Sequence, residues 1–541
     1  MRTIINIIYR YFNTLRYLYF KQFFFRILRL IPKKITKVLH EEIMLETFNT
    51  SDWFRITSKS SFDGYSFSFL NEDKAFNEDI WNEKIENSLW EYNLHYLDFL
   101  NENEVKNKFD ILMSWIFATD IGKGTAYDPY PTSLRVTNII KWCIQEKIDN
   151  KLIKDNLFLQ SRWLNKNLEW HLMGNHLLAN FKAIIFAGYF FDNPESKKWL
   201  KKTKEDLIQQ LSFQILDDGG HCELSPMYQN ILIQDLLDLR ELNSISKKDY
   251  DAHFEELLDD YILKTINWSC YLSHPDDQIS FFNDSSFNIA SKAIELKKYA
   301  QKFLSFDESN FRVKHLTSSG FIRILNENWS GILDVGDIGL DCNPGHAHAD
   351  SLSFELSYKA NRLFVNSGTS LYQRSNLRSF QRSTAAHSTV EVNNENSSDV
   401  WDSFRVGKRA KNKGVSIIDK NGKIKISSSH DGYKSLFSGH THERQWEFTN
   451  SQFILKDVLL GKSVYAKSRL YLHHDIDIKN YSKDEIEIQL ADNSRLSINI
   501  PENNFIVKDS FYYPEFGLSK KNKCIEIELK QNYSMISVTL I

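Results

Sequence analysis

The chain has 541 residues, which is too long for a single small hydrophobic core, so we expect about two to four domains. Hydrophobic residues make up 42% and charged residues 25%, which is typical of an ordinary globular protein. The formal net charge of −3 gives no electrostatic footprint for a nucleic acid, so we expect no nucleic-acid partner.

Residues 1–50 are predicted to form a basic, aromatic, helical segment, beginning "MRTIINIIYRYFNTLRYLYFKQFFFRILRL". Arg10, Arg16, Lys21, Arg26 and Arg29 interrupt its apolar residues, so no run approaches the roughly 18–20 residues of a spanning helix. No apolar stretch precedes a small-residue cleavage site, so we predict no cleavable signal peptide. Two interpretations stay open: residues 1–35 make a peripheral contact with an anionic membrane, or they pack on the rest of the protein.

Residues 51–310 are predicted to form an all-helical domain. Apolar residues recur at three- and four-residue spacing from about residue 85 to 305, as in "SLRVTNIIKWCIQ" and "GNHLLANFKAIIFAGYFF". Short polar or Gly/Pro breaks separate these stretches. Many helices with short connections indicate antiparallel hairpins stacked as a bundle, a solenoid or a closed toroid.

Two places in this helical region carry polar groups beside apolar helices. Asn175 and His176 follow Gly174 at the start of a long apolar stretch, where Asn175 is either the helix N-cap or an amide donor to a substrate carboxylate. Farther on, "GGHCELSPMYQ" places Ser225 as an N-cap, Pro226 in the first helical position and Tyr228 in the first turn. Tyr228 is either a core aromatic or a base whose pKa the helix N-terminus lowers from about 10.

Residues 311–541 are predicted to form an antiparallel β-sandwich or barrel. From about residue 312 the hydrophobic period changes to two, in segments such as "GFIRIL", "SLSFELSYK", "RLFVNSG", "KIKISSS" and "CIEIELKQ". Gly, Asn and Asp separate the segments, and no helix is expected between them. The fold class is therefore a multidomain α+β protein with a helical half followed by a β half.

Three histidines stand out in the β half. His346 and His348, in "NPGHAHADSLSFEL", would project from one face of a strand, and His387 precedes another alternating run. Such a set binds a metal or transfers protons. Arg374, Arg378 and Arg382 lie ahead of His387, where any of them could bind an anionic substrate.

The order of these motifs resembles that of the heparinase II/III-like polysaccharide lyases, the family of heparinases and related alginate lyases. The resemblance rests on seven segments, which occur in the family's order from about residue 85 almost to the C-terminus: "LWEYNLHYLDFL", "PYPTSLRVTNIIKW", "GNHLLANFKA", "GGHCELSPMYQ", "GHAHADSLSFEL", "RSTAAHSTVEV" and "HDGY" with "HER". It implies an incomplete (α/α) toroid over residues 51–310 and an antiparallel β-sandwich over residues 311–541. The first 80 or so residues fall outside it.

The resemblance also implies a polysaccharide lyase that cleaves a uronate-containing acidic polysaccharide by β-elimination at the toroid/sandwich interface. Such an enzyme neutralises the uronate carboxylate, removes the weakly acidic C5 proton and protonates the leaving O4. By resemblance, Asn175 with His176 neutralises the carboxylate, Tyr228 is base, acid or both, and His346 is catalytic. His387 acts on substrate if it binds no metal, and Tyr372 and Arg382 are substrate-binding candidates.

The implied cofactor is one divalent metal, zinc or calcium, held by His348, residue 366 and His387. The family's usual Asp is replaced here by Asn366, a weaker neutral ligand, which argues against a tight zinc site. The implied location is the cell envelope or periplasm, with the cytoplasmic membrane surface as the alternative.

Two other functions stay open at this point. One is a non-catalytic or biosynthesis-associated glycan-binding protein at the inner membrane. The other is a hydrolase that uses Glu223 with Asp350 as paired carboxylates.

Overall fold

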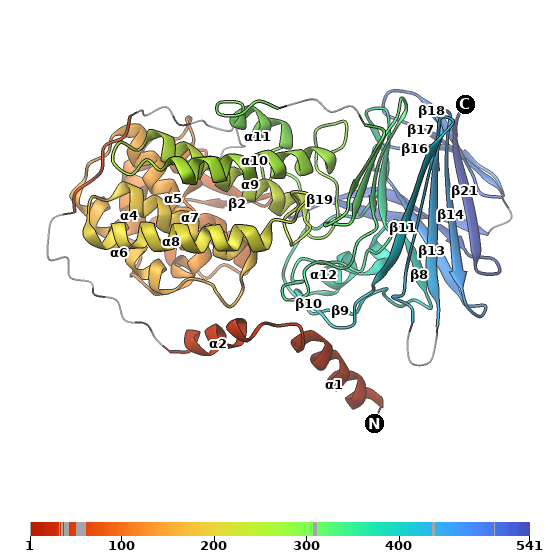
Figure 1. The fold of residues 1–541 in the computed structure, drawn as a ribbon, viewed down its shortest axis with the longest axis horizontal. Coiled ribbons are helices and arrows are strands. Elements are labelled where there is room, and N and C mark those ends of the chain that lie inside the picture. Colours follow the sequence, from red (N-terminus) through yellow and green to blue (C-terminus); the bar gives the residue numbers. More distant parts are fainter. Residues whose placement is uncertain are drawn as a thin grey trace.

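The computed structural model describes residues 2–31, 33, 36, 43–49, 53, 61–306, 311–434, 439–501 and 504–541. The predicted domain boundaries at residues 50/51 and 310/311 lie at or within segments outside these ranges. A helical half and a β half follow one another along the chain, as the change in hydrophobic period predicts (Figure 1). The multidomain α+β class is therefore confirmed.

The helices are α1 (Arg2–Leu15), α2 (Phe20–Arg29), α3 (Ser88–Leu94), α4 (Lys108–Ala118), α5 (Pro129–Glu146), α6 (Lys151–Lys166), α7 (Gly174–Phe190), α8 (Pro194–Gln214), α9 (Pro226–Ile245), α10 (Ala252–Tyr271), α11 (Ala293–Ala300) and α12 (Asn376–Gln381). Four short 3-10 helices are η1 (Glu78–Asn82), η2 (Asp98–Asn101), η3 (Thr125–Tyr127) and η4 (Thr384–Ala386). None of these described helices is both long and apolar enough to cross a membrane.

The strands are β1 (Ser66–Phe69), β2 (Glu72–Ala75), β3 (Val313–Leu316), β4 (Phe321–Leu325), β5 (Trp329–Asp334), β6 (Phe354–Tyr358), β7 (Asn361–Val365), β8 (Val390–Val392), β9 (Val400–Trp401), β10 (Arg405–Val406), β11 (Asn412–Lys420), β12 (Lys423–His430), β13 (Thr441–Phe448), β14 (Gln452–Leu460), β15 (Ala466–Leu472), β16 (Asp477–Tyr481), β17 (Glu485–Gln489), β18 (Arg495–Asn499), β19 (Phe505–Glu515), β20 (Leu518–Glu528) and β21 (Tyr533–Leu540).

The helical half is built around α7, whose side chains are buried along almost its whole length. Phe181 of α7, Ile140 of α5 and Leu236 of α9 belong to one hydrophobic core. A helix that is apolar on all sides is stable only when other helices surround it. This burial fixes the first turn of α7, with Asn175 and His176, relative to α9.

Two large antiparallel sheets form the β half. One sheet has the order β11-β12-β13-β14-β21-β18-β17-β16, and the other has the order β19-β20-β15-β7-β6-β5-β4-β3, with β8 paired to β15. Leu356 and Ile324 of the second sheet share one core with Trp446 and Phe453 of the first, so the sheets pack face to face. Alternating burial in β12 and β14 follows from this packing, because one side of each strand faces the partner sheet.

Two local predictions were wrong. The helix α12 interrupts the β half, where no helix was expected, and the hairpin of β1 and β2 precedes the helices in the region predicted to be all-helical. Both elements are too short for their sequence period to be distinctive.

A third hydrophobic cluster joins the two halves. Met227 and Tyr228 of α9 pack in it with Val365 of β7, Tyr471 of β15 and Tyr512 of β19. Tyr228 is therefore held where the helical half meets the second sheet.

Candidate active site

A cavity of about 1210 Å³ lies between the two halves. Its lining includes Tyr130, Asn175, His176, Glu223 and Tyr228 from the helical half, and Asn343, His346, Tyr372 and Phe404 from the β half. A site at such an interface forms only when both halves are folded together.

Asn175 reaches the cavity through a strained turn. Met173 and Gly174 have φ angles of 60° and 58°, and α7 begins at Gly174 with Met173 as its N-cap. The N-cap interpretation of Asn175 was therefore wrong. Its amide Nδ2 instead donates to Glu223 Oε2 at 2.8 Å, while its buried Oδ1 has no hydrogen-bond partner in the described structure. An unpaired buried acceptor beside a cavity is costly unless a ligand supplies a donor.

His176 follows Asn175, lines the cavity and forms an ion pair with Glu169. Its Nδ1 lies 3.2 Å from Glu169 Oε2, and its ring packs on Tyr130 with centroids 4.4 Å apart. Burial opposes the charge of this imidazole, but Glu169 outweighs burial and raises the pKa of His176. The site therefore contains a histidine whose environment favours the cation.

Tyr228 occupies the first turn of α9, as predicted. Ser225 caps the helix by accepting from the Tyr228 N–H, Pro226 is the first helical residue, and the Tyr228 hydroxyl lies 2.9 Å from the Tyr372 hydroxyl. Burial, and then the neighbouring Tyr372 and Asp284, raise the pKa of Tyr228 well above its usual value. The expected lowering by the helix N-terminus was wrong, because loss of solvation opposes the phenolate more strongly than the dipole favours it.

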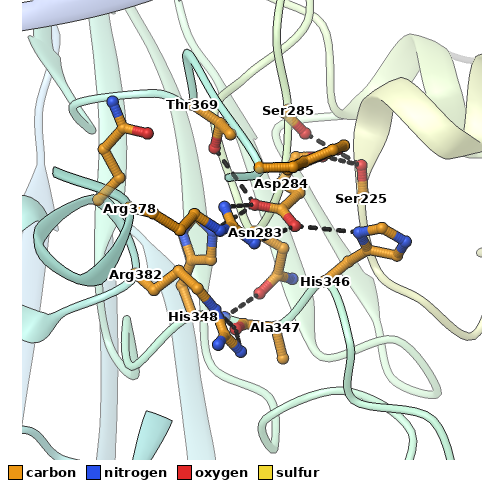
Figure 2. Close-up of polar contacts among 12 residues, drawn as sticks. Ser225, Asn283, Asp284, Ser285, His346, Ala347, His348, Thr369, Arg378 and Arg382 are labelled. Carbon is orange, nitrogen blue, oxygen red and sulfur yellow. Dashed lines mark hydrogen bonds and ion pairs between the residues drawn. The ribbon is translucent and has the colours of Figure 1, made fainter. Parts of the chain in front are cut away.

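His346 and His348 do not lie on a strand, contrary to the prediction. They belong to an irregular loop that precedes β6, yet both imidazoles converge on one buried carboxylate (Figure 2). His346 Nδ1 lies 3.0 Å from Asp284 Oδ2, and His348 Nε2 lies 2.9 Å from Asp284 Oδ1. His346 also packs on Tyr228, with ring centroids 4.1 Å apart.

Asp284 was missed by the sequence analysis. It is fully buried, and besides the two histidines it accepts two hydrogen bonds from the Arg378 guanidinium of α12. Burial alone would raise its pKa, but Arg378 and the histidines hold the pKa of Asp284 well below its usual range. The segment "FFNDSSF" around it has only the composition of a turn, so no local signal marks this residue.

His348 and His387 lie side by side, as a shared metal site requires. His348 Nδ1 and His387 Nε2 are 3.1 Å apart, while His387 Nδ1 faces the Ser383 carbonyl at 2.7 Å. His348 Nε2 and His387 Nδ1 therefore carry the protons, because each faces an oxygen acceptor. In neutral rings the lone pairs of His348 Nδ1 and His387 Nε2 would then point at each other, and only a proton or a cation between them removes the repulsion. Burial lowers the pKa of His348 to about 4 and that of His387 to about 3.

Asn366 does not complete this metal site. Its Oδ1 accepts from the Ser388 N–H at 3.0 Å, and its Nδ2 donates to the Phe281 carbonyl at 3.0 Å. Because both ends of the amide are used in holding the backbone, the three predicted ligands do not fit a closed zinc or calcium site.

Two of the three arginines in the α12 region, Arg378 and Arg382, have structural roles. Arg382, predicted to bind substrate, is only 1% exposed, is absent from the described cavity lining and donates to the carbonyls of Ala347, Trp401 and Asp402. It thus holds the histidine loop, and its guanidinium is not available to a glycan. Arg374 is exposed, and Arg378 is paired with Asp284.

The paired carboxylates of the hydrolase hypothesis are not brought together at the cavity. Glu223 lines the cavity, whereas Asp350 is buried outside its described lining. Burial would raise the pKa of Glu223, but His221, His346 and Asn175 lower it, so Glu223 is an anion that holds Asn175. A glycosidase needs a second carboxyl group facing the same bond.

Comparison with known proteins finds two matching family models and similar curated relatives. Residues 151–312 match the model described as heparinase II/III N-terminus, and residues 308–537 match the model described as heparinase II/III-like, C-terminal. A heparin-sulfate lyase of Bacteroides stercoris is 26% identical over 328 residues, covering 56% of this chain and 46% of the relative. A heparin-sulfate lyase of Bacteroides thetaiotaomicron is 24% identical over 270 residues, covering 41% of this chain and 37% of the relative.

The fold is also similar to that of a solved heparinase III. The TM-score is 0.68 at 16% identity, with 85% of this chain and 79% of that chain covered. The aligned regions span less than half of either curated relative's length.

Proposed function

Because the chain belongs to the heparinase II/III-like family, we propose that its cavity is the active site of a polysaccharide lyase that cleaves a uronate-containing acidic glycan by β-elimination. The observation that carries this proposal is the convergence of His176, Tyr228 and His346 on one cavity, beside the unpaired Oδ1 of Asn175. Supporting it, the named relatives are heparin-sulfate lyases. The proposal includes the incomplete (α/α) toroid and a location in the cell envelope.

Two groups can stabilise the negative charge of the uronate carboxylate. The His176 cation, favoured by Glu169, supplies the positive charge that stabilises the carboxylate as electrons shift into it. Asn175 can donate the second N–H of its amide to the carboxylate, because Glu223 accepts the first and holds the amide in place. Neutralising the carboxylate makes the C5 proton more acidic.

The remaining groups divide the proton transfers. His346 donates from Nδ1 to Asp284, so in the neutral ring Nε2 has the lone pair that can remove the C5 proton. Tyr228 has a raised pKa and stays a neutral phenol, so it can donate its proton to the leaving O4 and recover one through Tyr372. Elimination then leaves an unsaturated uronate on the new non-reducing end.

The cavity lining favours a glycan of low sulfate density. Its described carboxylates are Asp98, Glu102, Glu223, Asp235, Asp238, Glu295 and Glu515, whereas its described cationic side chains outside the histidines are Lys141, Lys182 and Lys292. Lys141 and Lys182 are already paired with carboxylates of α9, at 2.6–2.8 Å. A densely sulfated chain needs many unpaired cations, above all arginines.

The test is incubation with unsulfated and sulfated uronate polysaccharides, followed by the ultraviolet absorbance of the unsaturated product. We expect Tyr228→Phe to lower the rate by about 10²–10⁴-fold, while Tyr465→Phe, an exposed tyrosine away from the cavity, retains activity. No absorbance with any uronate glycan contradicts the lyase. Faster cleavage of the sulfated polymers contradicts only the proposed charge preference.

The same assay separates the alternative of a glycan-binding protein without turnover. That alternative predicts glycan binding that survives both Tyr228→Phe and His346→Ala, with no unsaturated product from the wild type.

A further inference from the structure

The two N-terminal helices, α1 and α2, pack on the molecule through polar, cationic and aromatic side chains; the Phe25 ring of α2, for example, stacks on Trp170 with centroids 5.9 Å apart. They lie along one edge of the protein, α2 beside the helical half and α1 toward β9 and β10 (Figure 1). Arg10 of α1 makes a two-point ion pair with Asp399, and Gln22 of α2 donates to the Cys342 carbonyl at 3.1 Å. Arg29 Nη1 lies 2.9 Å from His171 Nε2. The helix pair thus bridges both halves.

The opposite faces of these helices are apolar and exposed. On α1, Ile8, Phe12 and Leu15 follow at spacings of four and three residues, and on α2 Phe20, Phe24 and Ile27 do the same. Phe20 is 82% exposed, whereas Asn13 and Gln22 on the inner faces are 2% and 1% exposed. A surface helix ordinarily turns its apolar side to the core, whereas most of the large apolar side chains of α1 and α2 face outward. A contiguous apolar face on a folded protein is a binding surface.

The charge of the segment indicates what binds there. Residues 2–37 contain Lys and Arg but no Asp or Glu, in a chain whose net charge is −3. Arg16, Lys21, Arg26 and Arg29 are exposed, close to the apolar side chains. Apolar residues flanked by Arg and Lys match a surface with acyl chains beneath anionic headgroups.

We propose that α1 and α2 form a peripheral membrane contact, in which the Ile8 and Phe20 faces enter the headgroup boundary of an anionic bilayer. The helices have 14 and 10 residues, too short to span a membrane, so they lie in its plane. Pairing with a second copy is opposed by like charges on both faces. The contacts of α1 and α2 with the rest of the protein would then hold the cavity at a fixed distance from the bilayer. Gln22, for example, binds Cys342, which directly precedes the cavity residue Asn343.

The experiment is vesicle flotation of the full chain, without glycan. One set of vesicles is pure phosphatidylcholine and the other contains added phosphatidylglycerol. We expect binding to the anionic vesicles that weakens as salt rises, and little binding to the neutral ones. The variant Phe20→Ser/Phe24→Ser/Ile27→Ser should lose at least about tenfold in partitioning, because its apolar face is gone. All three residues are exposed, so the fold should be retained.

A control removes three exposed apolar residues from the β half: Ile418→Ser/Tyr481→Ser/Ile506→Ser. It should bind anionic vesicles like the wild type. The proposal is overturned if the wild type does not bind, if both triple variants lose binding equally, or if the exposed face proves to be a dimer contact, with self-association that only the α2 variant abolishes. Because no substrate is present, none of these results depends on the lyase activity.

Discussion

Asp284 is the residue on which the two histidines of the site depend. Its carboxylate pairs with both His346 and His348. Asp284 is fully buried, and the Arg378 guanidinium compensates the charge of this carboxylate. An imidazole that donates to a carboxylate is held in one tautomer and one orientation. The proton acceptor proposed here is therefore set by a residue from the helical half acting on a loop from the β half.

The isosteric variant Asp284→Asn should be both less stable and less active. It leaves the Arg378 cation buried without its partner, which costs about 3–5 kcal/mol in the free energy of unfolding. Urea unfolding measures this loss, and the exposed Asp509→Asn is the control, expected to change stability by no more than about 0.5 kcal/mol.

The pH dependence of this difference has a definite sign. Because the pKa of folded Asp284 is depressed, its contribution is complete above about pH 4, the unfolded value, and is lost as pH falls toward the folded pKa. The wild type and Asp284→Asn should therefore converge in stability under acid conditions. A constant difference between the variants down to acidic pH would contradict this role of the carboxylate.

At the scale of elements, the turn into α7 decides where Asn175 lies. Gly174 has a φ of 58°, and a Cβ atom there would lie 2.1 Å from Glu223 Oε1. The carboxylate that holds Asn175 therefore occupies the space that any other residue at position 174 would need. The glycine is required both by its backbone angle and by this close approach.

Gly174→Ala should disturb activity more than its backbone strain alone predicts. The left-handed conformation costs about 1–2 kcal/mol, and the clash adds a displacement of Glu223 and Asn175. The matched control is Gly422→Ala, since Gly422 has a φ of 76° but open space around its Cβ position. If both variants lose stability equally and keep full lyase activity, the close approach has no functional role.

At the scale of the whole molecule, buried neutral histidines make the fold sensitive to acid. Burial, and then Arg135, lower the pKa of His95 to about 3, and His95 Nδ1 accepts from the Trp115 indole at 3.2 Å. A neutral histidine inside the protein takes up no proton in the range where the unfolded chain does, below about pH 6.5. The free energy of unfolding should therefore fall as pH decreases from 6.5 toward 3.

His95→Gln should reduce this slope by about 1.4 kcal/mol per pH unit, the value for one proton. Chemical unfolding at several pH values gives the slope, and His253→Gln, at an exposed position, controls for the substitution itself. An unchanged slope in His95→Gln would mean that other groups account for the acid sensitivity.

The sequence alone predicted the helical half, the β half and the motifs that the cavity uses. Strong periodicity made this possible: the alternating segments "GFIRIL", "SLSFELSYK" and "KIKISSS" contain or overlap β4, β6 and β12. The start of α9 was predicted because its cap and first-turn proline are local signals. Asn175, His176, Tyr228, His346 and Tyr372 all line the cavity.

Only the tertiary structure decided how these residues act together. The pKa of Tyr228, the burial of Arg382 and the use of Asn366 in backbone hydrogen bonds depend on groups far away in the sequence. Asp284 carries no local signal, because its partners come from the histidine loop and from α12. Periodicity and capping are set by neighbours in the chain, whereas burial, hydrogen-bond pairing and charge compensation are set by neighbours in space.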